Sequence, residues 1–168
     1  PAGELMASDH FKVLVEETSK AGYEHYEISN FAKEGFIAVH NSSYWRGEPY
    51  FGVGPSAHSY AGNTRRWNVA NNTLYLKNIL AGKSAYETEV LSETNRFNER
   101  IMLGLRAKWG VDLERIKSDF GDEFFNHLSS AIEKHIQSGN LSMNNSILSL
   151  TQNGKFLSDG IASDLFVV

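Results

Sequence analysis

Residues 40–59 read HNSSYWRGEPYFGVGPSAHS, and this stretch gathers histidine, aromatic, glycine and proline residues within a short span. Glycine and proline interrupt regular structure, so the stretch predicts turns rather than a long helix or strand. We expect a short helix or turn over residues 38–45 and a brief strand over 50–53, after which Gly54-Pro55 turns the chain. Core packing alone rarely needs this combination, so the stretch is the first candidate for a binding site.

A helix and then a strand are predicted ahead of this stretch. Residues 9–21 have the spacing of an amphipathic helix, with Ser8 as its N-cap and Gly22 at its end. Residues 23–28 predict a strand, and residues 33–38 predict a loop. A helix followed after one glycine by a strand is half of a βαβ repeat. The order therefore predicts the end of a parallel α/β barrel.

A hairpin, a helix and a connector are predicted after the stretch. Residues 59–69 predict a hairpin around Gly62-Asn63, and residues 71–81 predict an amphipathic helix. The polar composition that follows indicates a domain boundary. We expect a first domain over residues 1–82 and a connector over 83–92.

The remaining residues, 93–168, predict a mostly helical second domain. Helices are expected over 93–107, 112–120, 122–138 and 151–165, and a hairpin over 141–150. Three helices, a two-stranded wing and a closing helix make a winged-helix-like module. Such modules often bind DNA, but Lys134 is the single Lys or Arg residue in the sequence of the helix over 122–138. Because DNA binding depends on neutralising phosphates, we expect no nucleic acid partner.

Four motifs resemble those of a known family. They are YEISNFA at residues 26–32, HNxxYW at 40–45, GxGPSAxS at 52–59 and LTxxG at 150–154. Together they resemble the oxygen-independent coproporphyrinogen III oxidase-like proteins, a radical SAM family. HNxxYW is typical of the HemW-type branch, whose members are regarded as heme chaperones. The resemblance covers nearly the whole chain and corresponds to about the C-terminal half of such a protein.

The resemblance implies a fold class and cofactors. The fold would be α+β, with the C-terminal α/β units of a partial radical SAM barrel followed by a mostly helical winged-helix-like domain. The parent protein would bind S-adenosylmethionine and hold a [4Fe–4S] cluster on a CxxxCxxC motif near its N-terminus. This sequence has no cysteine and no initiator Met. We therefore expect a fragment that cannot hold the cluster and is not active alone.

His40 is the strongest candidate ligand in HNxxYW. Histidine is the commonest protein ligand of heme iron, and a residue four positions on, Tyr44, would lie beside it on a helix. The resemblance implies that His40, Tyr44 and Trp45 contact heme, with His40 as a possible iron ligand. The alternative is a hydrogen-bonded structural histidine at a domain seam, and spacing alone leaves it open.

Gly52, Gly54 and Ser56 form a second candidate site. The spacing GxGxxA superficially matches a dinucleotide fingerprint, but Pro55 removes a backbone donor and no long helix follows. A better interpretation is that the glycines let the backbone approach a flat ligand. The resemblance implies a position near the S-adenosylmethionine site. A glycine-rich turn required only by chain geometry stays open.

Glu27, Asn30 and Arg65 complete the candidate cofactor-binding residues. Glu27 and Asn30 would lie at the end of a strand, where barrel proteins carry binding residues. The resemblance implies that this strand lines the cofactor side of the barrel. Arg65 suits the carboxylates of porphyrin propionates, which guanidinium groups bind in pairs of hydrogen bonds. Turn chemistry for Asn30 and a solvated surface position for Arg65 remain alternatives.

Composition limits the remaining classes of function. A hydrophobic content of 41% and a charged content of 21% are ordinary for a globular protein. A net charge of −4 argues against a nucleic acid or an anionic membrane surface as partner. The sequence shows no apolar run near the ~20 residues of a membrane helix, and no signal peptide. We expect a cytoplasmic protein without an integral membrane segment.

The expected function is therefore in heme or porphyrin metabolism, as a heme chaperone or an oxidase. Expected partners are heme or porphyrin and a heme-accepting protein. An exposed barrel edge would also favour a homodimer. A non-catalytic ligand-binding or partner-binding module is the alternative, and a CxxxCxxC motif upstream in the parent would argue against it.

Overall fold

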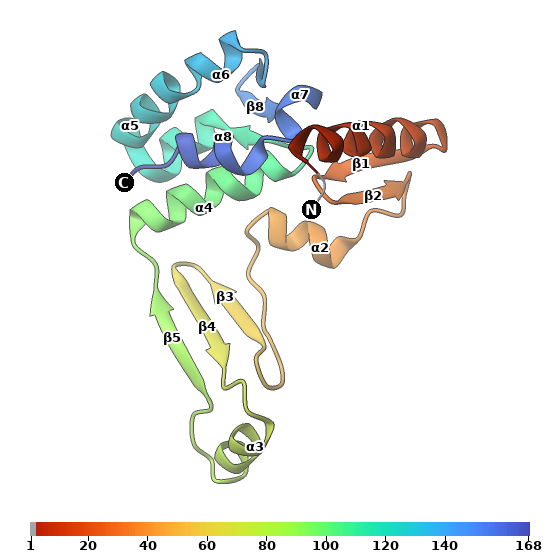
Figure 1. Ribbon diagram of the computed structural model, residues 1–168. Helices are drawn as coiled ribbons and strands as arrows, with labels where there is room; N and C mark the ends of the chain where they lie inside the picture. The colour runs from red at the N-terminus through yellow and green to blue at the C-terminus, as the bar shows by residue number, and fades with distance from the viewer. Residues whose placement is uncertain (1–2) are drawn as a thin grey trace. The chain divides into compact units, whose positions relative to one another are not determined.

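The computed structural model describes residues 3–168, which form two compact units (Figure 1). Unit 1 combines the chain up to Arg46 with residues 97–168, and unit 2 comprises residues 47–96. The domains predicted from the sequence, 1–82 and 93–168, divide the chain differently, and their boundaries stay a prediction.

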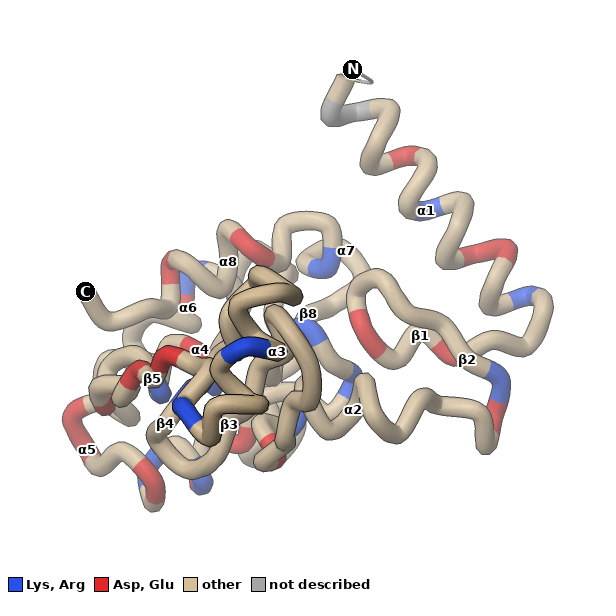
Figure 2. The backbone as a smooth tube through the Cα atoms, turned by 90° about the horizontal axis from the view of Figure 1, so that it is seen from below, with Lys and Arg blue, Asp and Glu red and all other residues tan. Residues whose placement is uncertain are grey.

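The first part of unit 1 contains two helices and a two-stranded sheet. The elements are α1 (Glu4–Lys20), β1 (Tyr23–Glu27), β2 (Asn30–Lys33) and α2 (Val39–Trp45). α1 begins earlier than predicted and ends as predicted ahead of Gly22, whose φ of 79° suits a helix terminus. Acidic and basic residues alternate along α1 (Figure 2), which is typical of a solvated helix surface.

The strand β2 was not predicted, because residues 29–32 read as the end of one strand and 33–38 as a loop. β1 and β2 pair antiparallel, with His25 opposite Phe31. A side chain closes the turn between them, since Oε2 of Glu27 accepts hydrogen bonds from the backbone N–H of Ser29 and the side-chain amide of Asn30. Such a turn needs no glycine or proline and leaves little sequence signal. This hairpin does not test the parallel barrel, which stays a prediction.

The second part of unit 1 is mostly helical. Its elements are α4 (Glu93–Arg106), β6 (Val111–Asp112), α5 (Leu113–Ala131), α6 (Glu133–Gln137), β7 (Leu141–Asn144), β8 (Ile147–Leu150), α7 (Gln152–Lys155) and α8 (Ser158–Asp164). The three strands form one antiparallel sheet in the order β6-β8-β7. The predicted helices and hairpin are present, although the last helix is divided into α7 and α8 and β6 was not predicted.

The hydrophobic core of unit 1 lies between α4, α5, α8 and this sheet. Phe97, Ile101 and Leu105 of α4 are almost wholly buried, as their four-residue spacing predicts. Burying such side chains contributes ~1.5–3 kcal/mol each. The other buried members of the cluster are Val111, Leu113, Ile116, Leu128, Ile132, Leu141, Leu148, Ile161, Ala162 and Leu165.

Unit 2 is a three-stranded antiparallel sheet with one helix. β3 (His58–Ala61) and β4 (Thr64–Asn68) form the predicted hairpin, and α3 (Asn72–Leu80) is the predicted helix. The expected strand over 50–53 is wrong, because this segment forms only a single bridge between Tyr50 and Tyr60. Residues 86–90, within the predicted connector 83–92, form β5 (Tyr86–Val90), which pairs with β4.

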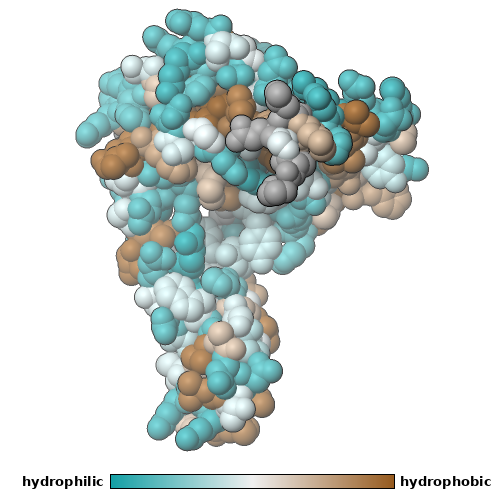
Figure 3. Space-filling model, in the orientation of Figure 1, coloured by the Kyte–Doolittle hydropathy of each residue, from teal (hydrophilic) through white to brown (hydrophobic). Residues whose placement is uncertain are grey.

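The surface of unit 2 over α3 includes several exposed apolar side chains. α3 has no buried residue, and Figure 3 shows hydrophobic side chains exposed over it. Leu80 is 86% exposed and Leu76 is 57% exposed. The amphipathic pattern therefore predicted the helix correctly, although its apolar positions do not enter a core within unit 2.

None of the helices across residues 3–168 combines the length and the apolar composition that a membrane span requires.

Candidate functional site

The helix α2 presents His40 and Tyr44 on its exposed side. Their rings lie edge to face, with centroids 4.8 Å apart and an interplanar angle of 82°. His40 is exposed, and neither of its ring nitrogens has a hydrogen-bond partner within residues 3–168. Ligation by His40 and the alternative of a structural histidine at a domain seam both stay predictions. An imidazole in this setting can bind a ligand without first breaking an internal bond.

The other residues of the HNxxYW motif attach α2 to unit 1. The Asn41 side-chain amide donates to the Tyr26 hydroxyl at 3.4 Å, and Ser42 is buried. Trp45 packs inward, with the guanidinium of Arg106 5.2 Å from its ring centroid. The motif thus alternates between side chains that hold the helix and side chains that it exposes.

Two large apolar residues precede His40 on the surface. Phe36 and Val39 are each 81% exposed, and Tyr44 is 37% exposed. Sequence reasoning missed Phe36 and Val39. The sequence did contain a signal for them, because apolar side chains in a short connection between two elements are rarely buried in a core. Exposed apolar groups next to the His40 imidazole suit contact with an apolar partner or ligand.

Glu27 is buried and fully engaged by other residues of unit 1. Its side chain is 0% exposed, and Oε1 accepts from Arg106 Nε at 3.1 Å and pairs with Nη2 at 3.0 Å. Ser29 and Asn30 occupy Oε2. A ligand that bound Glu27 or Asn30 through these atoms would have to displace one of these partners.

Arg106 joins three of the elements in unit 1. Besides Glu27 of β1 and Trp45 of α2, it binds Asp159 of α8, with Nη1 3.1 Å from Oδ1. Sequence reasoning did not select Arg106. Glu27 and Arg106 are 79 residues apart, so no local pattern could have found the contact.

Backbone geometry explains the residues of the glycine-rich loop of unit 2, residues 52–56. A Cβ added at Gly52 would lie 2.1 Å from the backbone oxygen of His58, so only glycine fits there. Gly54 has a φ of 99° and Ser56 a φ of 61°, both in the left-handed region. The Asn68 amide donates to the Gly54 carbonyl at 2.8 Å. Chain geometry alone thus accounts for both glycines, and approach of a ligand to this loop stays a prediction.

Arg65 and Arg66 have different surroundings on β4. Arg65 lies 3.8 Å from Glu89 of β5, and Arg66 stacks over Tyr86 with its guanidinium carbon 3.8 Å from the ring centroid. Arg66, with Gly52 and Asn68, also lines a cavity of about 220 Å³ in unit 2. Arg66, and not the predicted Arg65, therefore lines this cavity.

The predicted site residues fall into separate groups. Glu27 and Trp45 contact Arg106, and Asn30 donates to Glu27. His40 and Tyr44 share the exposed side of α2. Gly52, Gly54, Ser56 and Arg65 belong to unit 2. No three His, Asp or Glu side chains gather as a metal-binding cluster within residues 3–168. Ligation of a metal by His40 stays a prediction.

Comparison with known proteins defines the class to which this fold belongs. Residues 91–157 match the family model of the HemN C-terminal domain, which overlaps the predicted second domain. Coproporphyrinogen III oxidase (HemN) from Escherichia coli, a radical SAM enzyme, aligns with 93% of this chain and 40% of its own, with a TM-score of 0.71 and 14% identity. At that identity the likeness shows a shared fold, and the expected α+β class is confirmed.

Two relatives show the family within this class to which the chain belongs. Heme chaperone HemW from Lactococcus lactis subsp. lactis is 38% identical over 117 residues, which cover 70% of this chain and 31% of that protein. Heme chaperone HemW from Bacillus subtilis is 31% identical over 155 residues, which cover 92% of this chain and 41% of that protein. The chain belongs to the family of HemN- and HemW-type proteins, and it spans 31–41% of the length of these relatives.

Proposed function

We propose that this chain is part of a HemW-type protein of heme metabolism and that it binds heme, with the His40 imidazole as an iron ligand. The observation that carries the proposal is the exposed His40 on α2, without a hydrogen bond to either ring nitrogen within residues 3–168. Histidine is the commonest protein ligand of heme iron. The HemW relatives, named as heme chaperones, support heme as the ligand.

The residues around His40 suit a flat apolar ligand. The Tyr44 ring lies edge-on to the imidazole and limits its rotation. Phe36 and Val39 expose apolar surface that a porphyrin ring would remove from water, at ~25 cal/mol per Å². Heme, when bound, would supply an iron that the His40 imidazole could ligate. The chain's own contribution is to hold that imidazole through Asn41 and Trp45.

The remaining predicted residues are secondary parts of this proposal. Trp45, Glu27 and Asn30 would support α2 and the adjoining hairpin from within unit 1. Arg65 would bind a propionate, and Gly52, Gly54 and Ser56 would lie near a cofactor in the complete protein. The supporting roles of Glu27, Asn30 and Trp45 rest on the contacts described above. The roles of Arg65, Gly52, Gly54 and Ser56 rest on the family resemblance.

S-adenosylmethionine and a [4Fe–4S] cluster are proposed only for the longer parent protein. These 168 residues include no cysteine, so they do not fit a cluster held by thiolates. We assign no catalytic step to this chain alone. A cytoplasmic location, a heme-accepting protein and a homodimer formed through a sheet edge complete the proposal.

The test is a hemin titration of the chain followed by Soret absorbance. The His40→Ala variant should weaken binding at least tenfold, which corresponds to ~1.4 kcal/mol, because an iron ligand is lost. His10→Ala is the matched control, since His10 is also an exposed histidine on a helix of unit 1. It should leave the titration unchanged.

Two outcomes would contradict the proposal. If His40→Ala titrates like the unaltered chain, His40 is not the ligand. If the unaltered chain shows no saturable Soret change, heme binding by this chain is wrong.

A further inference from the structure

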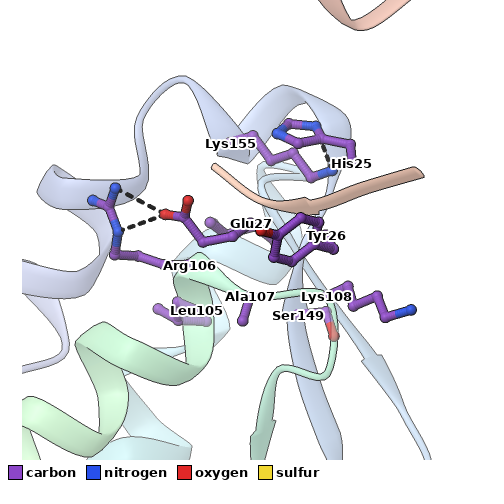
Figure 4. A pocket seen from close by; sticks show the side chains of 10 residues that line it. His25, Tyr26, Glu27, Leu105, Arg106, Ala107, Lys108, Ser149 and Lys155 are labelled. Atoms are coloured by element: carbon purple, nitrogen blue, oxygen red, sulfur yellow. Dashed lines mark hydrogen bonds and ion pairs between the residues drawn. The ribbon is translucent and has the colours of Figure 1, made fainter. Parts of the chain in front are cut away.

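A cavity of about 160 Å³ lies within unit 1, and neither His40 nor Tyr44 is among its lining residues. Figure 4 shows the side chains that line it. β1, the end of α4, β8 and α7 form its walls. Its polar lining includes His25, Glu27, Arg106, Lys108 and Lys155. A volume of this size admits several waters or a ligand of a few heavy atoms.

Two of the three cations around the cavity already have carboxylate partners. Arg106 binds Glu27 and Asp159, with contacts of 3.0–3.1 Å. Lys108 Nζ lies 2.6 Å from Glu24. Lys155 differs, because no carboxylate of the described residues lies within ion-pair distance of its ammonium group.

The only hydrogen-bond partner of the Lys155 ammonium within residues 3–168 is an imidazole. His25 Nε2 lies 3.0 Å from the Ile28 carbonyl, so Nε2 carries the proton and donates. Nδ1 of the same ring is then an acceptor, and Lys155 Nζ lies 3.1 Å from it. This contact uses one of the three donors of the ammonium group.

Packing holds the His25 ring in this orientation. It stacks on Phe31, with centroids 4.2 Å apart and an interplanar angle of 14°, and Phe11 approaches edge-on at 5.8 Å. The imidazole therefore fixes the position of the ammonium beside the cavity. Glu27 does not offer an alternative partner, because both of its oxygens are occupied.

Burial of Lys155 has an energetic consequence. Loss of hydration lowers the pKa of Lys155, and no neighbouring carboxylate offsets this effect. A buried or half-buried charge without a counter-charge is costly, and a bound anion would reduce that cost. The Lys155 ammonium, unlike Arg106 and Lys108, thus lacks a negatively charged partner beside the cavity.

We propose that this cavity binds a small oxyanion, a carboxylate or a phosphate, through the Lys155 ammonium that His25 positions. The oxyanion would accept hydrogen bonds from the two remaining ammonium donors and occupy the space beside Arg106 and Ser149. This site is independent of heme binding at His40.

The test is NMR observation of the His25 ring in the full chain during separate titrations with acetate and inorganic phosphate, with chloride keeping the ionic strength constant. We expect a saturable shift with at least one of them, and the one that saturates at lower concentration identifies the class of oxyanion. Lys155→Met should weaken that binding at least tenfold. Lys155→Gln, which keeps a hydrogen-bond donor but no charge, is the second variant should the first fail to fold.

Lys134→Met is the matched control. Lys134 is a lysine of unit 1 that pairs with Asp164 at 2.7 Å and does not line the cavity. It should leave the saturable shift unchanged. Shifts that do not saturate with either anion, or that persist unchanged when Lys155 loses its charge, would overturn the proposed site.

Discussion

At the scale of single residues, Glu27 and Arg106 carry the most consequential contact of unit 1. Glu27 is fully buried, so replacing Arg106 by methionine leaves a carboxylate without its counter-charge. Breaking a buried ion pair from one side costs ~3–5 kcal/mol. We expect Arg106→Met to lower the free energy of unfolding by this amount. Urea denaturation would show it as a midpoint at lower urea concentration.

A double-mutant cycle separates this effect from the loss of other Arg106 contacts. Adding Glu27→Gln to Arg106→Met should recover part of the stability, because the unpaired buried charge is removed. Additive losses in the cycle would mean that the two side chains do not interact energetically.

His25 makes the stability of the chain depend on pH. Burial is the main cause that lowers the pKa of His25, and Lys155 lowers it further, while the Ile28 carbonyl and Glu27 act in the opposite direction. The unfolded chain then binds a proton more readily than the folded chain. The free energy of unfolding should therefore decrease as pH falls below about 6.5.

Urea denaturation at several pH values measures this dependence. His25→Gln should show a smaller loss of stability between pH 7 and pH 5, whereas His10→Gln, at an exposed position, should keep the full loss. Equal pH dependence in all three chains would rule out His25 as its source.

At the scale of elements, Gly121 interrupts α5. Its φ of 82° and ψ of −178° are accessible essentially only to glycine, and a Cβ there would meet no atom within 4 Å. Gly121→Ala should thus cost ~1–3 kcal/mol through backbone strain alone. The urea midpoint measures this cost.

Gly160→Ala is the matched control, because Gly160 lies in α8 and an added Cβ there also meets nothing within 4 Å. It should be neutral or stabilise by up to ~1 kcal/mol, since alanine favours helix. A loss of stability at Gly160 equal to that at Gly121 would contradict the assignment of strain to the α5 break.

At the scale of the whole molecule, the two units differ in buried apolar surface. The core cluster belongs to unit 1, whereas the almost fully buried apolar residues of unit 2 within the described chain are Ala85 and Leu91. Local stability follows buried contacts. Hydrogen exchange should therefore show faster exchange in α3 and β3–β5 than in α4 and α5. Equal protection of both units would indicate that they unfold together.

The sequence by itself determined those features that depend on neighbouring residues. Four-residue spacing located α4, Gly62-Asn63 located the β3–β4 hairpin, and the helical spacing of His40 and Tyr44 placed their rings together. Only the tertiary structure decided that Arg106 meets Glu27 across 79 residues and that Lys155 meets His25 across 130 residues. The physical reason is that backbone spacing and turn propensity act over a few residues. Contacts between distant residues arise only when the packing of α4, β8 and α7 brings their side chains beside β1.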